Sequence, residues 1–510
     1  MRLTFDQNLL GVLEKAKTMG VTSKQVALEL GVDEFLVAQR FKALSEQNLI
    51  SQVGRNLWIL KHYEDMAADP LFTRPEVYMR RLQKDCGVRF SNYAKGITFS
   101  ENGTKRIHRW SPYVQGFSAE FVEDMFSKYV ISEGSKVLDP FCGSGTVLVC
   151  AKMRGIDSLG VDLMPLMKFM ATVKTTWDLN VQKVRDFLEA FPKIREYRIE
   201  IPKPFLRETD KQFDPAVLDN LLRVKQFVWD VFEKDGDVGN LFKLALASIL
   251  VSCSNLKRSP CLGYVKNKRV PSDAPFIYFL KKVNEMIKDL RWVQQNVKKQ
   301  GKVDVEEKDA RTASYGKDEI SMAITSPPYV NGMDYVINYK IEMTWLELVK
   351  SYEDLRQLKE KMVVCDNVSR RLIKNYSPFY SDEWLDDICS KIAKRVEEKG
   401  SYRRADMHLI VRKYFDDIYP VLKSVYDALK ERARFLIVIG DSLMAGIYIP
   451  ADLIVAKMGK ELGYQIEDIL VARQRRSGQR HDFKLRESIV VLRKGGKEET
   501  TLPKTLERYL

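Results

Sequence analysis

The stretch VLDPFCGSGT, Val137 to Thr146, joins the end of an apolar run to a turn that contains two glycines. The run predicts a strand that ends at Asp139, and the residues after the turn, TVLVCAKMRG, have the apolar spacing of a helix. Gly143 and Gly145 permit a tight turn, and the start of the helix offers free N–H groups. A ligand can therefore approach the backbone closely at this turn.

A carboxylate follows one strand later. The segment SLGVDLMP predicts a second strand that ends at Asp162. A carboxylate in that place can accept hydrogen bonds from both hydroxyls of a ribose. The turn matches neither the phosphate-binding loop GxxxxGK[ST] nor the dinucleotide pattern GxGxxG. Loop and acid together suit a nucleoside cofactor without phosphate, and the alternative is a purely structural strand–turn–helix unit.

The second informative stretch is AITSPPYVNGMDY, Ala323 to Tyr335, which follows the strand-like run ISMAI. A bare PPY is usually a turn or a ligand for another domain. The strand before this one and the glycine loop upstream favour a functional site. Prolines restrict the backbone, so a carbonyl in this stretch is held in one direction.

These two stretches resemble the motifs of a known family. DPFCGSGT resembles the S-adenosyl-L-methionine (AdoMet) binding motif of the amino-methylating DNA methyltransferases, and TSPPY resembles their catalytic motif. The variant that begins with serine is associated mostly with N4-methylation of cytosine, whereas N6-adenine enzymes more often carry Asp or Asn there. The resemblance extends more loosely over residues 106–495 and implies AdoMet as the cofactor.

The resemblance also implies roles for individual residues. Ser326 Oγ and the Pro327 carbonyl would accept the two protons of the target amino group, and Tyr329 would stack on a base flipped out of the helix. Asp309 in EKDAR is expected near the adenine ring, and Tyr113 precedes the glycine loop in a segment where the family places an extra cofactor-binding helix. The implied catalytic residues are Ser326, Pro327, Pro328 and Tyr329, and the implied cofactor-binding residues are Asp139, Pro140, Phe141, Gly143, Gly145, Thr146, Asp162, Asp309 and Tyr113.

A rival chemistry and a metal site find little support. C5-methylation of cytosine needs a Pro-Cys nucleophile, and Pro260-Cys261 lies in a basic loop without the flanking pattern, so we interpret it as incidental. The seven cysteines have no CxxC spacing, which predicts neither a disulfide framework nor a zinc site, and reduced thiols fit a cytoplasm. No metal ligand is assigned.

The chain organisation predicts a doubly wound, Rossmann-like α/β sheet of the AdoMet-dependent methyltransferase type, with a helical insertion and an N-terminal winged helix-turn-helix. Asp139 and Ser326 are 187 residues apart. The strand–helix units between them in a doubly wound fold need only about 60 to 80 residues, at about 30 residues per unit. The expected domains are a winged helix-turn-helix over 1–61, a linker over 62–105, a first methyltransferase part over 106–175, a helical insertion over 176–305 and a second methyltransferase part over 306–500.

The partner expected from charge is double-stranded DNA. The net charge of +14 favours a polyanion, and the insertion 176–305 is the expected target-recognition region, with a clamp over 350–405. The alternative for the basic loop is a solvated charged face, and the alternative for the winged helix is a protein-interaction module. The candidate DNA-binding residues are Lys257, Arg258, Lys266, Lys268, Arg269, Arg475, Arg476 and Arg480.

The sequence therefore predicts a site-specific DNA methyltransferase that transfers a methyl group from AdoMet to N4 of a flipped cytosine, in a restriction-modification or related system. That role leaves room for a cognate restriction endonuclease as a second partner. The alternatives are an N6-adenine DNA methyltransferase, an RNA base methyltransferase and a catalytically idle winged-helix regulator. No apolar run approaches the length of a membrane span and no signal peptide is recognised, so we expect a cytoplasmic protein.

Overall fold

The computed structural model describes residues 5–16, 21–47, 49–54, 57–60, 71–259, 261–364, 370–374, 376–400, 404–476 and 484–495. Its centre is an eight-stranded sheet in the order β4-β14-β15-β11-β10-β5-β6-β9. The strands are, in chain order, β4 (Phe90–Asn92), β5 (Lys136–Asp139), β6 (Asp157–Asp162), β9 (Val303–Glu307), β10 (Ile320–Thr325), β11 (Leu429–Gly440), β14 (Tyr464–Arg476) and β15 (Lys484–Lys494).

The strand order reverses between β5 and β10. From β5 the chain passes outward to β6 and then β9, and all these neighbours are parallel. It then returns to β10, which lies on the other side of β5 and parallel to it, with Ala323 opposite Leu138. In open α/β sheets a ligand binds beyond the carboxyl ends of the strands at such a reversal. The two motifs follow β5 and β10, so the topology brings them to the same crevice.

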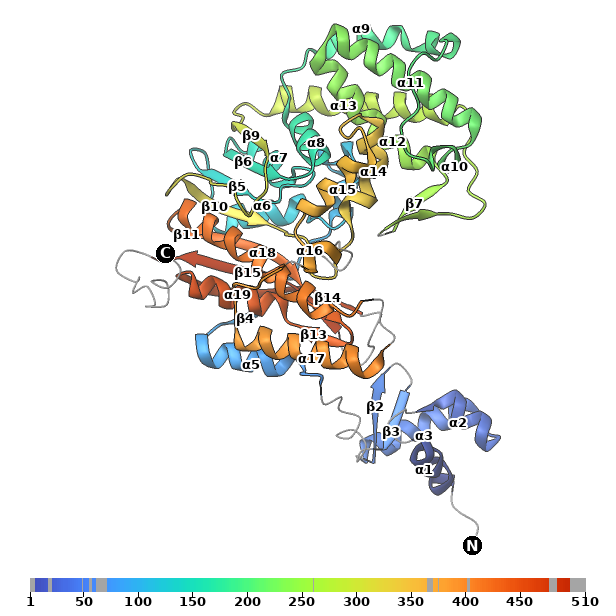
Figure 1. Ribbon diagram of the computed structural model, residues 1–510, viewed down its shortest axis with the longest axis vertical. Helices are drawn as coiled ribbons and strands as arrows, with labels where there is room; N and C mark the ends of the chain where they lie inside the picture. Colours follow the sequence, from blue (N-terminus) through green and yellow to red (C-terminus); the bar gives the residue numbers. More distant parts are fainter. Residues whose placement is uncertain are drawn as a thin grey trace.

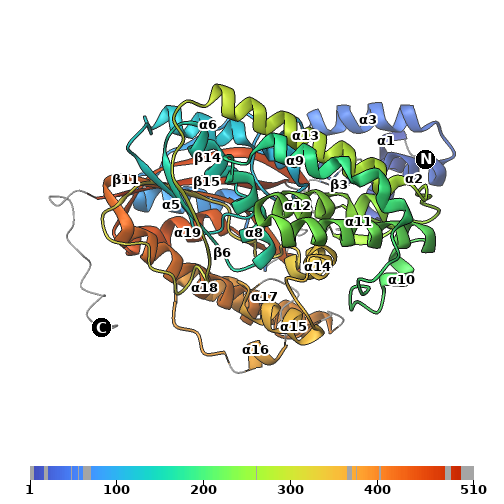
Figure 2. The same ribbon diagram turned by 90° about the horizontal axis from the view of Figure 1, so that it is seen from above.

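Helices cover both faces of the sheet, as the doubly wound prediction requires. Ile437 and Ile439 of β11 pack with the core of α17 (Glu383–Lys399), α18 (Met407–Ala428) and α19 (Ala451–Glu461). Leu436 and Val438, which alternate with them, pack with α6 (Ala119–Lys128) and α7 (Thr146–Met153). Figure 2 shows α18 and α6 on opposite sides of the strands. The near-continuous apolar run FLIVIG is explained by this two-sided burial.

A largely helical segment follows α8 (Pro165–Thr175), where the sequence predicts an insertion, and forms the upper lobe in Figure 1. It ends before β9, which belongs to the central sheet, so the domain boundary lies a few residues earlier than 305. The helix Gly236–Cys253 is long and apolar enough to cross a membrane, but its residues form the core of this lobe, where 61% of its apolar window is buried. The insertion contains α9 (Val181–Glu189), α10 (Thr209–Gln212), α11 (Pro215–Lys234), α12 (Gly236–Cys253), the hairpin β7 (Leu256–Arg258) and β8 (Leu262–Tyr264), and α13 (Ala274–Asn296).

A second helical excursion follows the catalytic motif. It contains α14 (Tyr335–Trp345), α15 (Tyr352–Lys361), α16 (Arg370–Lys374) and then α17 and α18, which return the chain to β11. α14 packs with the core of the insertion, whereas α17 and α18 pack against the sheet. Within 350–405, α15 packs with the core of the insertion through Leu355, and α17 packs into the core that includes β11, so this segment connects the two lobes. Its interpretation as a clamp stays a prediction.

The N-terminal unit has its own small core. It contains α1 (Phe5–Ala16), β1 (Val21–Thr22), α2 (Ser23–Leu30), α3 (Glu34–Glu46), β2 (Ile50–Gly54) and β3 (Leu57–Leu60), with the strands in the order β1-β3-β2. Thr22 caps α2 through a capping box and Asp33 caps α3. The interpretation as a winged helix-turn-helix stays a prediction.

The stretch predicted as a linker over 62–105 has a structural role in its described part. α5 (Pro75–Cys86) packs through buried Tyr78 and Leu82 into the core beneath the sheet. β4 adds an edge strand parallel to β14. Pro75 stands in the first turn of α5, where a helix tolerates proline because the missing N–H would have no partner within the helix. Residues 71–105 thus belong with the large domain.

Candidate functional site

The glycine loop takes the conformation that its sequence predicts. Gly143 and Gly145 have φ values of +48° and +82°, a region that side chains rarely tolerate. A Cβ at Gly143 would lie 2.7 Å from the hydroxyl of Tyr113, and one at Gly145 would lie 3.0 Å from Cβ of Ala171 in α8. Thr146 begins α7 directly after the loop. The glycines therefore allow both the turn and the close approach of the tyrosine.

Asp162, at the end of β6, anchors the loop. Its two carboxylate oxygens accept the N–H of Gly143 at 2.9 Å and the N–H of Met164 at 2.9 Å. Burial raises the pKa of Asp162 to about 6, although both N–H donors favour the ionised form. Each oxygen keeps a lone pair, so the carboxylate can still accept hydroxyl protons from a ribose.

Asp139 joins the two motifs. Its Oδ1 accepts the N–H of Phe141 at 3.1 Å and the hydroxyl of Thr325, the last residue of β10, at 2.7 Å. Burial raises the pKa of Asp139 to about 7, against the two hydrogen bonds. The residue before the catalytic motif is thereby fixed to the residue that begins the glycine loop.

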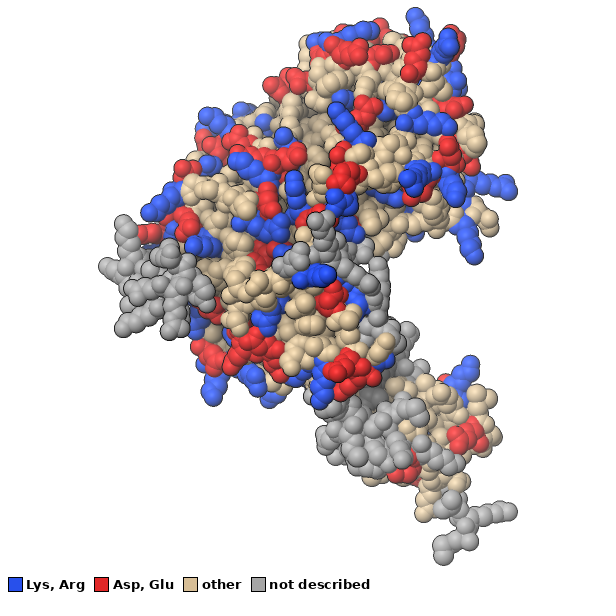
Figure 3. Space-filling view, in the orientation of Figure 1, with Lys and Arg blue, Asp and Glu red and all other residues tan. Residues whose placement is uncertain are grey.

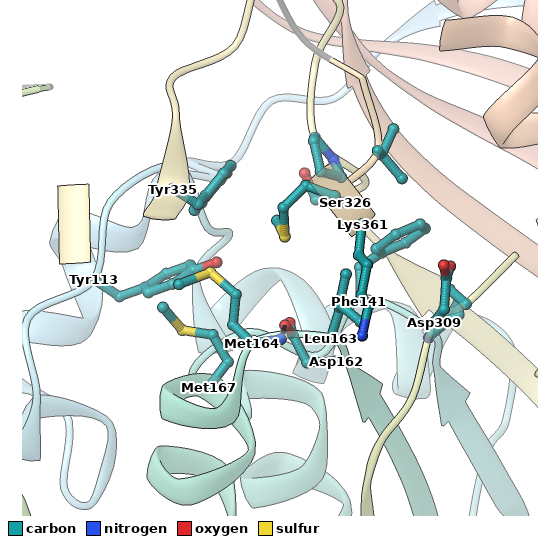
Figure 4. Close-up of a pocket in the computed structure, with 15 residues that line it drawn as sticks. Tyr113, Phe141, Asp162, Leu163, Met164, Met167, Asp309, Ser326, Tyr335 and Lys361 are labelled. Atoms are coloured by element: carbon teal, nitrogen blue, oxygen red, sulfur yellow. Dashed lines mark hydrogen bonds between the residues drawn. The ribbon is translucent and has the colours of Figure 1, made fainter. Parts of the chain in front are cut away.

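A hollow opens beyond these strand ends, and we call it the loop pocket. Asp162 lies at its floor, Tyr113 and Met164 lie on one side, and Ser326 lies above (Figure 4). The carboxylate of Asp162, together with the aromatic rings and methionine side chains of the lining, fits a nucleoside. The lining residues are Tyr113, Pro140, Phe141, Asp162, Leu163, Met164, Met167, Asp309, Ala310, Ser326, Pro328, Tyr335, Lys361, Met362 and Val363.

Asp309 lies at the edge of the loop pocket in an ion-paired setting. Arg311 donates from Nη2 to Asp309 at 2.7 Å and from Nη1 to Asp417 of α18 at 2.9 Å. Burial would raise the pKa of Asp309, but the hydrogen bonds and charge of Arg311 outweigh it and lower the pKa. Asp309 is therefore an ionised group held in one orientation beside the pocket.

The stretch SPPY, Ser326 to Tyr329, is held from several directions. Tyr414 of α18 donates its hydroxyl to the Pro328 carbonyl at 2.8 Å, whereas the Pro327 carbonyl accepts no hydrogen bond from any described residue. The Tyr329 hydroxyl donates to Glu487 of β15 at 2.6 Å. Burial raises the pKa of Tyr329 well above its usual range, and the nearby Ser326 side chain acts on that pKa in the opposite direction. The tyrosine is thus fixed from β15, with the serine beside it.

A second hollow borders the first, and we call it the motif pocket. Ser326 lines both pockets. Glu487, which holds Tyr329, also forms an ion pair with Arg473 of β14. A molecule in the motif pocket would meet a molecule in the loop pocket at the serine. The lining residues are Ile97, Thr98, Phe99, Ser100, Tyr113, Val114, Gln115, Gly116, Phe117, Ser326, Tyr329, Val438, Arg473, Arg475 and Glu487.

The structure separates the predicted DNA-binding residues of the insertion into two groups. Arg258 is directed inward: it donates to Glu342 at 2.7 Å and to the Asn338 carbonyl at 2.7 Å, and it lies 4.4 Å from the Tyr339 ring centre. Lys268 donates to the carbonyls of Val251 and Leu256 near the end of α12. Arg258 is thus held by interior partners, and Lys268 uses two of its three donors on backbone carbonyls, so neither is a free surface cation.

The other basic residues of this loop are exposed. Lys257, Lys266 and Arg269 lie on the surface of the β7–β8 hairpin and the loop after it, and Figure 3 shows basic side chains projecting at this edge. In the terminal strand pair, Arg475 lines the motif pocket. The Arg476 side chain and Arg480 lie outside the described residues.

The structure adds site residues that the motifs do not reveal. Glu487 and Arg473 come from the terminal strands, and Lys361 with its neighbours comes from the end of α15. None of them has a local pattern that distinguishes it from a solvated charge. The pairing of β14 with β15, which sets Arg473 opposite Glu487, is the signal that places two of them.

Comparisons with known proteins agree with this geometry. No protein-family model matches the chain. The chain is 24% identical over 427 residues to the Type II methyltransferase M.BsoBI of Geobacillus stearothermophilus, covering 75% of this chain and 83% of that protein. It is also 24% identical over 406 residues to M.AvaI of Nostoc sp., covering 74% and 83%, and 24% identical over 396 residues to M.MvaI of Kocuria varians, covering 72% and 84%.

Among solved structures, the chain aligns with the rRNA methyltransferase AviRa of Streptomyces viridochromogenes at a TM-score of 0.26 and 9% identity. The alignment covers 79% of this chain and 96% of that one. The similarity to the sequence relatives is the more informative comparison. Over about three quarters of its length the chain is similar to Type II methyltransferases, which supports a DNA methyltransferase with S-adenosylmethionine as its cofactor.

Proposed function

We propose that the chain methylates the exocyclic N4 of a cytosine in double-stranded DNA, using AdoMet bound in the loop pocket. The observation that carries the proposal is that Ser326 lines both pockets. A cofactor on one side and a flipped base on the other would meet at the first residue of SPPY. The serine in that position is the feature that favours cytosine over adenine.

The loop pocket would hold the cofactor through few polar contacts. Asp162 would accept the ribose hydroxyls, because its oxygens are already oriented by the Gly143 and Met164 N–H groups. Tyr113 and Phe141 would cover apolar parts of the molecule. The sulfonium of AdoMet supplies an activated methyl group when it is bound, so the protein needs mainly to position the acceptor and exclude water.

The motif pocket would hold the base. Tyr329 offers its ring for stacking, and its hydroxyl is fixed by Glu487, so the stacking plane is set before a base arrives. A cytosine amino nitrogen is a poor nucleophile because its lone pair is conjugated with the ring. Ser326 Oγ and the free Pro327 carbonyl can accept its two protons and favour the pyramidal form in which the lone pair is available. After it has accepted the methyl group, the amino nitrogen would lose one of its protons.

DNA would be contacted on both lobes. Lys257, Lys266 and Arg269 form an exposed basic surface on the insertion, suited to phosphates. Arg258 would act indirectly, because it fixes the hairpin to α14, the helix that follows the catalytic motif. A DNA substrate implies a cytoplasmic enzyme, and the Type II relatives favour a restriction-modification system with a cognate endonuclease.

The test is product identification together with one variant. Unmethylated bacterial DNA is incubated with the protein and AdoMet, digested to nucleosides and analysed by mass spectrometry. N4-methylcytosine is expected from the natural protein and should be strongly reduced with Ser326→Ala. If N6-methyladenine or 5-methylcytosine is the product instead, the proposal is wrong.

A further inference from the structure

Two arginines line the motif pocket, and they are engaged differently. Arg473 is neutralised by its ion pair with Glu487, the carboxylate that also accepts the Tyr329 hydroxyl. Arg475, two residues along β14, donates from Nη2 to the Asp441 carbonyl at 2.7 Å. Its remaining donors, among them the buried Nε–H, find no acceptor among the residues that the structure describes.

The guanidinium of Arg475 lies beside the ring of Tyr329. A Cβ on Gly440 would be 2.9 Å from Cε2 of Tyr329 and 3.2 Å from Nη2 of Arg475, so both groups converge on the same glycine at the end of β11. The Asp441 carbonyl holds the guanidinium in this place. A base stacked on the tyrosine ring would bring one of its edges to the arginine.

Unpartnered buried donors are costly in a folded protein, and each one calls for an explanation, of which a ligand is one. Here the pocket that contains the unpartnered donor also contains the catalytic serine. A ligand with hydrogen-bond acceptors on its ring edge would satisfy the arginine. Cytosine has two such acceptors, N3 and then the O2 carbonyl, next to its amino group. Adenine has N1 and then a C2–H group, which accepts nothing.

The geometry points to Arg475 as the residue that selects cytosine, by donating hydrogen bonds to the N3–O2 edge of the flipped base. This inference rests on the proposed function and deepens it. With adenine in the pocket the donor opposite C2–H would stay unpaired, and a site built to donate a hydrogen bond rejects a molecule that lacks the acceptor. Ser326 and the Pro327 carbonyl hold the amino group, and Arg475 reads the edge beside it.

A phosphate contact is the competing role for this arginine, and lysine separates the two. Lysine can replace arginine as a point charge against a phosphate, but it lacks the planar set of donors that reads two adjacent acceptors. The variants are therefore Arg475→Ala and Arg475→Lys. The matched control is Arg89→Ala, which removes an exposed arginine of the β4 edge that lines neither pocket.

Each full-length variant is given unmethylated bacterial DNA and saturating AdoMet, and N4-methylcytosine and N6-methyladenine are quantified by mass spectrometry. The salt dependence of DNA binding and the AdoMet affinity are measured alongside. Both Arg475 variants should form N4-methylcytosine about 10- to 100-fold more slowly, with a raised proportion of N6-methyladenine, unchanged AdoMet affinity and an unchanged salt slope. Arg89→Ala should behave as the natural protein.

Full activity of Arg475→Lys, together with a salt slope that is smaller by about 0.9 in Arg475→Ala, would show a phosphate contact and overturn the inference. Full activity of both variants would overturn it as well. Loss of AdoMet affinity would show that the arginine supports the fold rather than the base. Failure of the proposed function is seen separately, because it appears as the absence of N4-methylcytosine with the natural protein.

Discussion

Replacing Ser326 with alanine removes one hydroxyl from the point where the two pockets meet. The hydroxyl of Tyr329 keeps its hydrogen bond to Glu487 at 2.6 Å, so it is not left unsatisfied. The free energy of unfolding should therefore change by less than about 1 kcal/mol. Asp162 is untouched, and AdoMet affinity should stay the same.

The rate should respond very differently. A hydrogen bond made to the reacting group in the transition state is typically worth about 2–4 kcal/mol, which corresponds to about a 30- to 1,000-fold loss of rate. The assay is a single turnover with enzyme in excess over DNA and saturating labelled AdoMet. Ser321→Ala is the control, since it is the same change near the other end of β10, away from both pockets. A full rate in Ser326→Ala would refute the role of the serine.

Three further outcomes follow from the same site. AdoMet affinity measured by calorimetry should fall as the pH decreases through about 6, because Asp162 with its raised pKa becomes protonated there and stops accepting both hydroxyls. Asp162→Asn should bind AdoMet weakly at every pH, and an identical pH profile in the two proteins would exclude this carboxylate as the ribose acceptor. Replacing Lys257, Lys266 and Arg269 together with alanine should reduce the salt slope of DNA binding by about 0.9 per lost phosphate contact, whereas an unaltered slope would place the interface elsewhere. Tyr329→Phe should keep base stacking and DNA affinity but lower the single-turnover rate, because the hydrogen bond to Glu487 that fixes the ring beside Ser326 is lost. An unchanged rate would leave the ring as the only contribution of the tyrosine.

The geometry of the glycine loop and the carboxylate beside it could be predicted from the sequence because these parts are local. Gly143 and Gly145 stand where the backbone has positive φ, and Asp162 ends the next strand. The apolar runs likewise predicted the strands that carry both motifs. The length of chain between the two motifs predicts an insertion, and the structure has helices in this segment. The segment ends before β9, which begins at Val303, a few residues before the predicted boundary at 305.

The remainder depends on side-chain partners far away in the chain. The sequence predicts Arg258 as a surface cation in a basic loop. In the structure its guanidinium is directed inward and donates to Glu342, which lies 84 positions later in the chain. Lys268 is placed near a helix end in the same way. Glu487 cannot be recognised in an ordinary strand until pairing sets it beside Arg473 and Tyr329. Charge alone does not distinguish a DNA contact from an internal partner.

The central claim is that the two pockets hold AdoMet and a cytosine on opposite sides of Ser326. Its most direct test is the identity of the nucleoside that carries the label after incubation of unmethylated DNA with the natural protein and methyl-labelled AdoMet. N4-methylcytosine should carry the label, and Ser326→Ala should form it at a rate lower by about 30- to 1,000-fold. Label in N6-methyladenine, or in RNA but not in DNA, would contradict the claim.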